Sequence, residues 1–206
     1  MILIGISPSV SLKSAALAVL EKRLVRMRRQ YDLFDVIQVT LGDLETECIR
    51  LARGPSLCRR KRLYSQDRRP RKTVPSRPRL VFDMTETGTG PVTALRAQAI
   101  CVDGVRIVED GSWQKDPFGR ALGDNYRVPE TDLFRTLVRI LDHERLIMPE
   151  DPKGADGLSE AIEQVRKEPR LGIPSPDFRA AACLRALALP LWFRETVPYR
   201  RAYRAT

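Results

Sequence analysis

The stretch that decides the fold runs from Leu80 to Gly90 and reads LVFDMTETGTG. Three apolar residues lead directly into Asp83, a turn rich in Thr and Gly follows, and residues 91–99 have helical character. This pattern predicts a buried strand that delivers a carboxylate to the end of a sheet, where glycines let a ligand approach the backbone. Asp83 is then a metal ligand, a general base, or a cap of the turn or the following helix. The choice depends on whether other acids converge on it.

Outward from this stretch, short apolar runs alternate with amphipathic segments. Strands are predicted at residues 2–6, 15–21, 34–40, 80–82 and 105–109, with helix as a competing interpretation of 15–21. Helices are predicted from Asp43 to about residue 52, from Thr131 through an apolar stripe ending at Leu141, at 158–167, and from Asp177 towards Arg194. Residues 113–126 are rich in Gly, Pro, Asn and Asp and are predicted to form a mobile loop. The order predicts an α/β fold with a mixed sheet flanked by helices.

Positive charge is concentrated in one segment. The chain has a net charge of +10, and residues 59–79 hold ten Lys/Arg against one acid, a net charge of +9, which leaves about +1 for the rest. Such a segment attracts nucleic-acid phosphates without reading sequence, although a solubilising insertion is the alternative. The candidate nucleic-acid-binding residues are Arg59, Arg60, Lys61, Arg62, Arg68, Arg69, Arg71, Lys72, Arg77 and Arg79.

The four cysteines form no CxxC pair and His143 is the single histidine, so a zinc site is not expected. Cysteines among apolar residues indicate buried thiols in a reducing, cytoplasmic compartment. No signal peptide is expected, because Met1 leads directly into a strand-like run. The apolar run 180–193 is interrupted by Arg185 and Pro190 and is too short to span a bilayer, so no membrane partner is expected.

The order of four segments resembles the nuclease domain of the large subunit of bacteriophage terminases, which has an RNase H-like fold. The segments are SAALAVLEKR at 14–23 after the first strand, LVFDMTETGTGPVTALR at 80–96, YRVPETDLFRTLVRILDHERLIMP at 126–149 and PDFRAAACLRALALPLWF at 176–193. The resemblance implies phosphodiester hydrolysis with two Mg²⁺ or Mn²⁺ ions held by carboxylates, in DNA packaging. It places the catalytic, metal-binding acids at Asp83 and Asp177.

The chain departs from the family pattern at positions that matter for catalysis. Ser7 stands where the family carries its first catalytic Asp, so this catalytic position is vacated. The turn after Asp83 is longer by Glu86 and Thr87, and Glu86 is a candidate replacement metal ligand, with a solvated turn residue as the alternative. Asp177 is also a plausible helix N-cap. No phosphate-binding motif of an ATPase motor occurs in the chain.

These observations favour a single RNase H-like domain over residues 1–194, with a basic loop insertion at 59–79 before the Asp83 strand and a basic tail at 195–206. The favoured function is nucleic-acid binding, with DNA as the main partner, by a pseudoenzyme with weak or lost phosphodiesterase activity. The first alternative is an active Mg- or Mn-dependent endonuclease that cuts DNA in packaging or in a resolvase-like reaction. The second is a non-catalytic assembly protein whose partners are phage packaging or assembly proteins.

Overall fold

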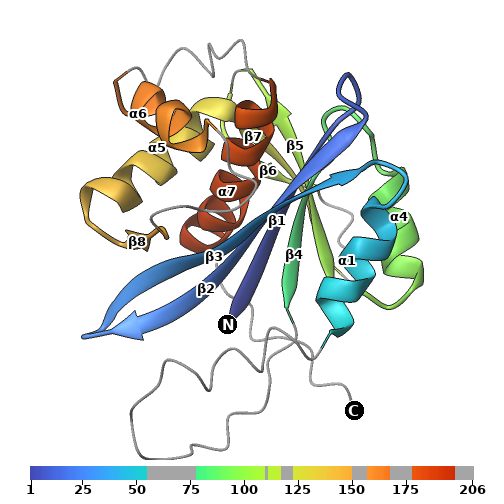
Figure 1. Cartoon of the computed structure of the whole chain (residues 1–206), viewed down its shortest axis with the longest axis horizontal. Coiled ribbons are helices and arrows are strands. Elements are labelled where there is room, and N and C mark those ends of the chain that lie inside the picture. The colour runs from blue at the N-terminus through green and yellow to red at the C-terminus, as the bar shows by residue number, and fades with distance from the viewer. Residues whose placement is uncertain (55–77, 110, 117–122, 150–156, 168–177, 198–206) are drawn as a thin grey trace, which may run out of the picture.

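The structure, a computed structural model, describes residues 1–54, 78–109, 111–116, 123–149, 157–167 and 178–197. These residues form one mixed sheet with helices on both faces (Figure 1). The strands are β1 Ile2–Ser9, β2 Ser14–Val25, β3 Arg28–Thr40, β4 Arg79–Asp83, β5 Val102–Val108, β6 Gln114–Lys115, β7 Asn125–Pro129 and β8 Leu146–Ile147. The helices are α1 Leu44–Arg53, α4 Gly90–Ala97, α5 Glu130–Asp142, α6 Leu158–Lys167 and α7 Phe178–Thr196.

The sheet has eight strands in the order β6-β7-β5-β4-β1-β2-β3-β8. Strand β2 is antiparallel to both of its neighbours, whereas β1, β4, β5 and β7 run parallel to one another. The two central strands β1 and β4 are almost continuous apolar runs, as expected for strands buried on both faces. Because β1 and β4 are parallel neighbours, their carboxyl ends meet at one end of the sheet.

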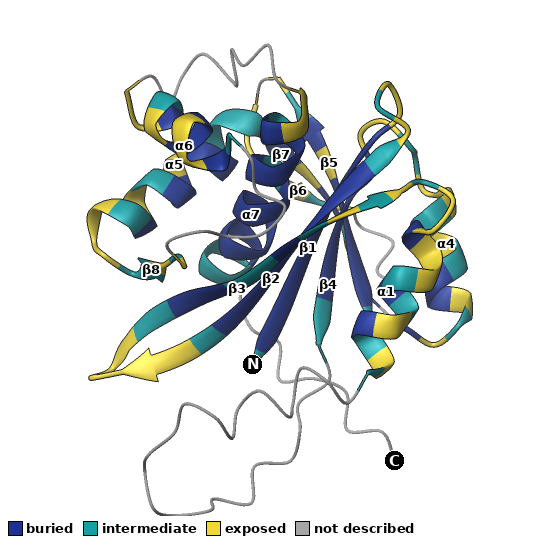
Figure 2. Cartoon of the chain, in the orientation of Figure 1, coloured by how far each residue is buried: buried dark blue, intermediate teal, exposed yellow. Residues whose placement is uncertain are grey.

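Side-chain alternation divides the core into two layers. From β1, Leu3 packs with helices α5, α6 and α7, whereas Ile4 and Ile6 pack on the other face with α1 and α4. Figure 1 shows these two groups of helices on opposite sides of the sheet, and Figure 2 shows that α7 is buried along most of its length. Helix α7 lies directly on β1, because a Cβ at Gly5 would overlap the carbonyl oxygen of Ala186 and lie 2.5 Å from Cδ of Pro190.

The predicted fold class is confirmed as an α/β fold in which a mixed sheet is flanked by helices. That this fold is RNase H-like stays a prediction. Two local predictions were wrong. The segment predicted as a loop at 113–126 contains β6 and the start of β7, because Gln114 and Lys115 pair with Arg127 and Tyr126. Helix α5 begins at Glu130, and its N-cap residue is Pro129, two residues before the predicted Thr131 cap.

The proposed boundaries at 194 and 195 stay predictions, and nearly all of the insertion at 59–79 and most of the tail lie outside the described residues. Within the described part of the chain, no helix is long and apolar enough to span a membrane. The apolar run at 180–193 is instead the central part of α7, buried against the sheet.

Candidate functional site

Ser7 and Asp83 lie side by side at the carboxyl ends of two parallel strands. The register pairs Ile6 with Phe82, so the next residue of each strand reaches the same end of the sheet. Both side chains are buried, and the Ser7 hydroxyl donates a hydrogen bond to Oδ2 of Asp83 at 3.3 Å. The two residues are 76 positions apart in the chain, and the fold brings them together.

The turn after β4 satisfies the other oxygen of Asp83. Oδ1 accepts hydrogen bonds from the backbone N–H of Thr85, at 2.9 Å, and from the Thr85 hydroxyl. The backbone N–H of Ile107 in turn donates to the Thr85 hydroxyl, which ties the turn to β5. Asp83 therefore caps this turn. This is one of the roles that the sequence left open, beside metal binding and general-base catalysis.

Burial raises the pKa of the Asp83 carboxyl above its ordinary value. The hydrogen bonds from Thr85, the positive charge of Arg185 and the hydrogen bond from Ser7 act in the opposite direction, in that order of size. The partners of this buried carboxylate are neutral hydroxyl and backbone N–H groups. It is costly to ionise because solvation by water is lost and none of the described residues brings a cation to hydrogen-bond distance.

A pocket of about 250 Å³ opens beside Ser7, between the start of α7 and the turns that follow β1 and β4. Its polar groups include Glu86 and Arg185. Neither side chain is free of partners: Glu86 Oε2 accepts a hydrogen bond from the Val10 N–H at 2.7 Å, and Arg185 forms an ion pair with Glu130 at 2.8 Å. The remaining lining residues are Pro8, Ser9, Ser11, Phe178, Ala181 and Ala182.

Of the predicted site residues, the structure brings Ser7, Asp83 and Glu86 to this end of the sheet, and Asp177 lies outside the described residues. Among the residues that the structure does describe, no group of three His, Cys, Asp or Glu side chains is arranged to hold a metal ion. Mg²⁺ and Mn²⁺ require several oxygen ligands. One buried Asp and one exposed Glu that is bonded to backbone do not amount to a two-metal site.

Sequence reasoning missed two residues of this site. Arg185 was treated only as an interruption of an apolar run, yet a lone cation in a buried helix is a signal for a polar partner, here Glu130. Thr85 was treated only as part of a Thr- and Gly-rich turn, although the spacing Asp-Met-Thr allows the side-chain to backbone hydrogen bond that is observed.

The predicted nucleic-acid-binding residues from Arg59 to Arg77 lie outside the described residues. Arg79 is described, and it is a structural residue of β4 rather than part of a loop. Its guanidinium forms an ion pair with the fully buried Asp103 at 2.6 Å and stacks over the ring of Phe193. Arg79 is therefore not available as a free cation.

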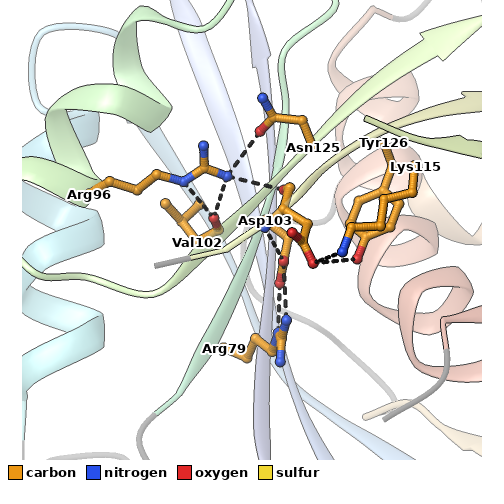
Figure 3. Close-up of polar contacts among 8 residues, drawn as sticks. Arg79, Arg96, Val102, Asp103, Lys115, Asn125 and Tyr126 are labelled. Atoms are coloured by element: carbon orange, nitrogen blue, oxygen red, sulfur yellow. Dashed lines mark hydrogen bonds and ion pairs between the residues drawn. The ribbon is translucent and has the colours of Figure 1, made fainter. Parts of the chain in front are cut away.

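Figure 3 shows the polar network to which Arg79 belongs. Arg96 donates to the carbonyl oxygen of Val102 and to Oδ1 of Asn125, and Asp103 Oδ1 accepts the N–H of Asp124. These contacts join α4, β4, β5 and β7. Because every acid in the network has a partner, it stabilises the sheet and offers no vacant ligand position.

Comparison with models of known protein families and with curated protein sequences gives no match. Among solved structures, the chain is similar to the fowlpox virus Holliday junction resolvase, with a TM-score of 0.40 and 8% sequence identity, over 96% of this chain and 100% of that chain. A similarity of this size establishes neither a family nor an activity. The resemblance to terminase nucleases stays a prediction from the sequence.

Proposed function

We propose that the chain is a nucleic-acid-binding protein, with DNA as the main ligand, whose metal-dependent phosphodiesterase activity is weak or lost. The hydrogen bond from Ser7 to Asp83 carries the proposal. Two-metal hydrolysis needs carboxylates between two closely spaced cations. At the position beside Asp83 this chain has a neutral hydroxyl, which is a poor ligand for a hard cation.

The electrostatic character of the chain supports the binding half of the proposal. The net charge is +10, and residues 59–79 carry most of it in sequence. Binding of such a segment to DNA releases condensed counterions and is strongly weakened by salt. A phage or prophage setting, with packaging or assembly proteins as further partners, follows from the terminase resemblance and is part of the proposal. So is a cytoplasmic location, which the free thiols of Cys48, Cys101 and Cys183 support.

Fluorescence anisotropy with a labelled 30-base-pair duplex tests binding. With about five phosphate contacts, the plot of log K against log[salt] should have a slope of about −4.5. Replacing Arg59, Arg60, Lys61 and Arg62 by Ser should flatten this slope, while a control that replaces Arg135 and Arg139 on α5 by Ser should change it little. A wild-type protein without salt-dependent binding would refute the proposal.

Plasmid nicking in Mg²⁺ and in Mn²⁺ tests the catalytic half. We expect little cleavage by the wild-type protein. The second candidate, an active endonuclease for packaging or a resolvase-like reaction, is favoured by one observation: Glu86 lines the same pocket as Ser7. Efficient cleavage by the wild type, abolished in Asp83→Ala and in Glu86→Gln, would establish the endonuclease and exclude the pseudoenzyme.

A further inference from the structure

Strands β2 and β3 extend beyond the rest of the sheet as a two-stranded arm. Pairing of β1 with β2 ends at Ile2 and Glu21, while β2 and β3 remain paired out to Val25 and Arg28. On its other side β3 meets β8 only at Tyr31 and Asp32. We call residues 22–29 the basic arm. The backbone of Lys22 still exchanges hydrogen bonds with Met1, but no further strand pairs with the arm, and Figure 1 shows β2 and β3 projecting from the body of the molecule.

The basic arm is densely cationic. Five of its eight residues are Lys or Arg and none is acidic. The net charge of about +1 for the chain outside 59–79 does not reveal this local concentration, because acidic residues elsewhere cancel it. Its sequence is Lys22, Arg23, Leu24, Val25, Arg26, Met27, Arg28 and Arg29. Both Arg26 and Arg28 are exposed, and neither forms an ion pair with an acid among the described residues. Two guanidinium groups are therefore available to an external anion.

Apolar side chains are exposed between these cations. Met27 is 87% exposed and Leu24 is 64% exposed, and Figure 2 shows the end of the arm as exposed surface. Arg26 and Met27 form the two-residue turn with φ of 47° and 67°. Both values lie in the left-handed region, where Asn-Gly is the favoured pair and long side chains are strained. The chain thus keeps an arginine and a methionine at a position where the backbone alone favours Asn and Gly.

The base of the arm is held rigidly. Glu195, near the end of α7, forms ion pairs with Arg29 and with Arg145, and it accepts a hydrogen bond from the Tyr31 hydroxyl. Two-stranded ribbons are marginally stable alone, so this attachment to α7 maintains the orientation of the arm. From the pair Lys22–Tyr31 to the pair Val25–Arg28, the arm is about 10 Å long at about 3.3 Å per residue.

We propose that the basic arm enters a groove of B-form duplex DNA, with Met27 at its tip. The inference rests on the proposed nucleic-acid-binding function and specifies the ligand. The major groove of B-DNA admits a two-stranded ribbon and is about 8.5 Å deep, so the arm is long enough to reach the floor of the groove. Arginines contact the phosphates, and the apolar tip residue can contact the thymine methyl group in the major groove.

The composition of the arm favours duplex DNA over other anionic partners. Single-stranded nucleic acid is bound by stacking on aromatic side chains, and residues 22–29 contain none. The major groove of duplex RNA is too narrow for side chains to read. A membrane-surface element separates an apolar face from a basic face, whereas strand alternation places a cation beside each apolar residue here, Lys22 with Leu24 and Arg23 with Val25.

The arm projects from the end of the sheet at which β4 begins. The arm begins where Ile2 pairs with Glu21, and the chain re-enters the sheet after residues 55–77 at Arg79, which pairs with Leu3. Ser7 and Asp83 lie at the opposite end of the same strands. About five residues of strand, roughly 17 Å, separate the two ends. The arm therefore lies at the end of the sheet away from the Ser7–Asp83 site and does not need that site.

The test uses a double variant of the arm that carries both Arg26→Ser and Arg28→Ser. Its matched control is a double variant of α5 that carries both Arg135→Ser and Arg139→Ser, which removes the same charge from exposed positions. Loss of two phosphate contacts reduces the salt slope by about 1.8, which weakens duplex binding about 60-fold at 0.1 M salt relative to a 1 M reference. The control pair should leave duplex binding nearly unchanged. Anionic vesicles and a single strand of the same sequence are measured in parallel.

A second variant guards against misfolding of the arm. Arg26→Asn with Met27→Gly provides the preferred turn, so we expect equal or higher thermal stability together with about 8-fold weaker duplex binding, from one lost phosphate contact, and a further loss from the missing methionine. If the wild type binds duplex DNA and both arm variants bind equally well, the arm inference is overturned and the proposed function stands. If the wild type does not bind, both fall. Variants that lose vesicle binding and retain duplex binding would identify a membrane-contacting arm instead.

Discussion

Replacing Ser7 by Asp is the most direct test of the site, because it places a second carboxylate beside Asp83. The Ser7 hydroxyl is 3.3 Å from Oδ2 of Asp83, and both residues are buried, so a second carboxylate here faces the first with little water between them. Two like charges about 4 Å apart repel by about 4 kcal/mol at an effective dielectric constant of 20. Sharing of one proton reduces this cost. In EDTA at pH 7.5 we expect Ser7→Asp to be about 2–4 kcal/mol less stable than Ser7→Asn.

Ser7→Asn is the control because it has the same size without the charge, and the pocket beside Ser7 can accept either side chain. Urea unfolding measures the difference, which corresponds to roughly 5–15 °C in thermal midpoint for a chain of this length. The stability gap should widen as pH rises from 4 to 8, because the folded state raises the carboxyl pKa above its unfolded value and stability is lost as the group ionises.

Mn²⁺ then separates a vacated metal site from a site that never held metal. A cation that binds only the folded variant restores about 2.7 kcal/mol at a hundred times its dissociation constant. We expect this rescue in Ser7→Asp and not in Ser7→Asn, with a gain in plasmid nicking that is smaller than the gain in metal affinity. Equal stability of the two variants in EDTA, or equal rescue by Mn²⁺, would refute the reasoning.

Three further predictions concern the core and the charges around it. In urea unfolding at pH 7, Asp83→Asn should be at least as stable as the wild type. This advantage should shrink as pH falls towards 4, because burial raises the pKa of Asp83 and the wild type loses stability as that group ionises. A large loss of stability of Asp83→Asn at pH 7 would show that the charge itself caps the turn. Gly5→Ala should destabilise the protein by about 1–3 kcal/mol because its Cβ meets Ala186 and Pro190 of α7, whereas Gly42→Ala, whose Cβ comes no closer than 3.7 Å to Thr40 Oγ1, should change the unfolding free energy little. Burial and the charges of Arg194 and Arg29 lower the pKa of Lys22 to about 8, so wild-type stability relative to Lys22→Gln should increase as pH rises from 8 towards 10.5; a constant difference between the two across this range would contradict the lowered pKa.

The sequence by itself determined the helices and five of the eight strands in their order, and it missed β6, β7 and β8. Apolar runs that contain few polar residues predicted β1 and β4, and Asp83 was correctly placed at the end of a buried strand. The extent of β2 and β3 was underestimated, because the turn at Arg26 and Met27 contains no glycine or asparagine and the arm beyond residue 21 has no apolar alternation to mark it as a strand. Strand pairing there is a property of two segments together, and neither segment shows it alone.

Only the tertiary structure decided which charged residues are free and which are committed. In the sequence Arg79 looked like the last cation of a basic segment, yet the register of β4 beside β5 places it against the buried Asp103. The net charge of about +1 outside residues 59–79 gave no sign of Arg26 and Arg28, yet these two residues project beyond the end of the sheet. The reason is physical: charge is counted along the chain, but its availability depends on burial and on partners that the fold brings together from distant positions, as it does for Ser7 and Asp83.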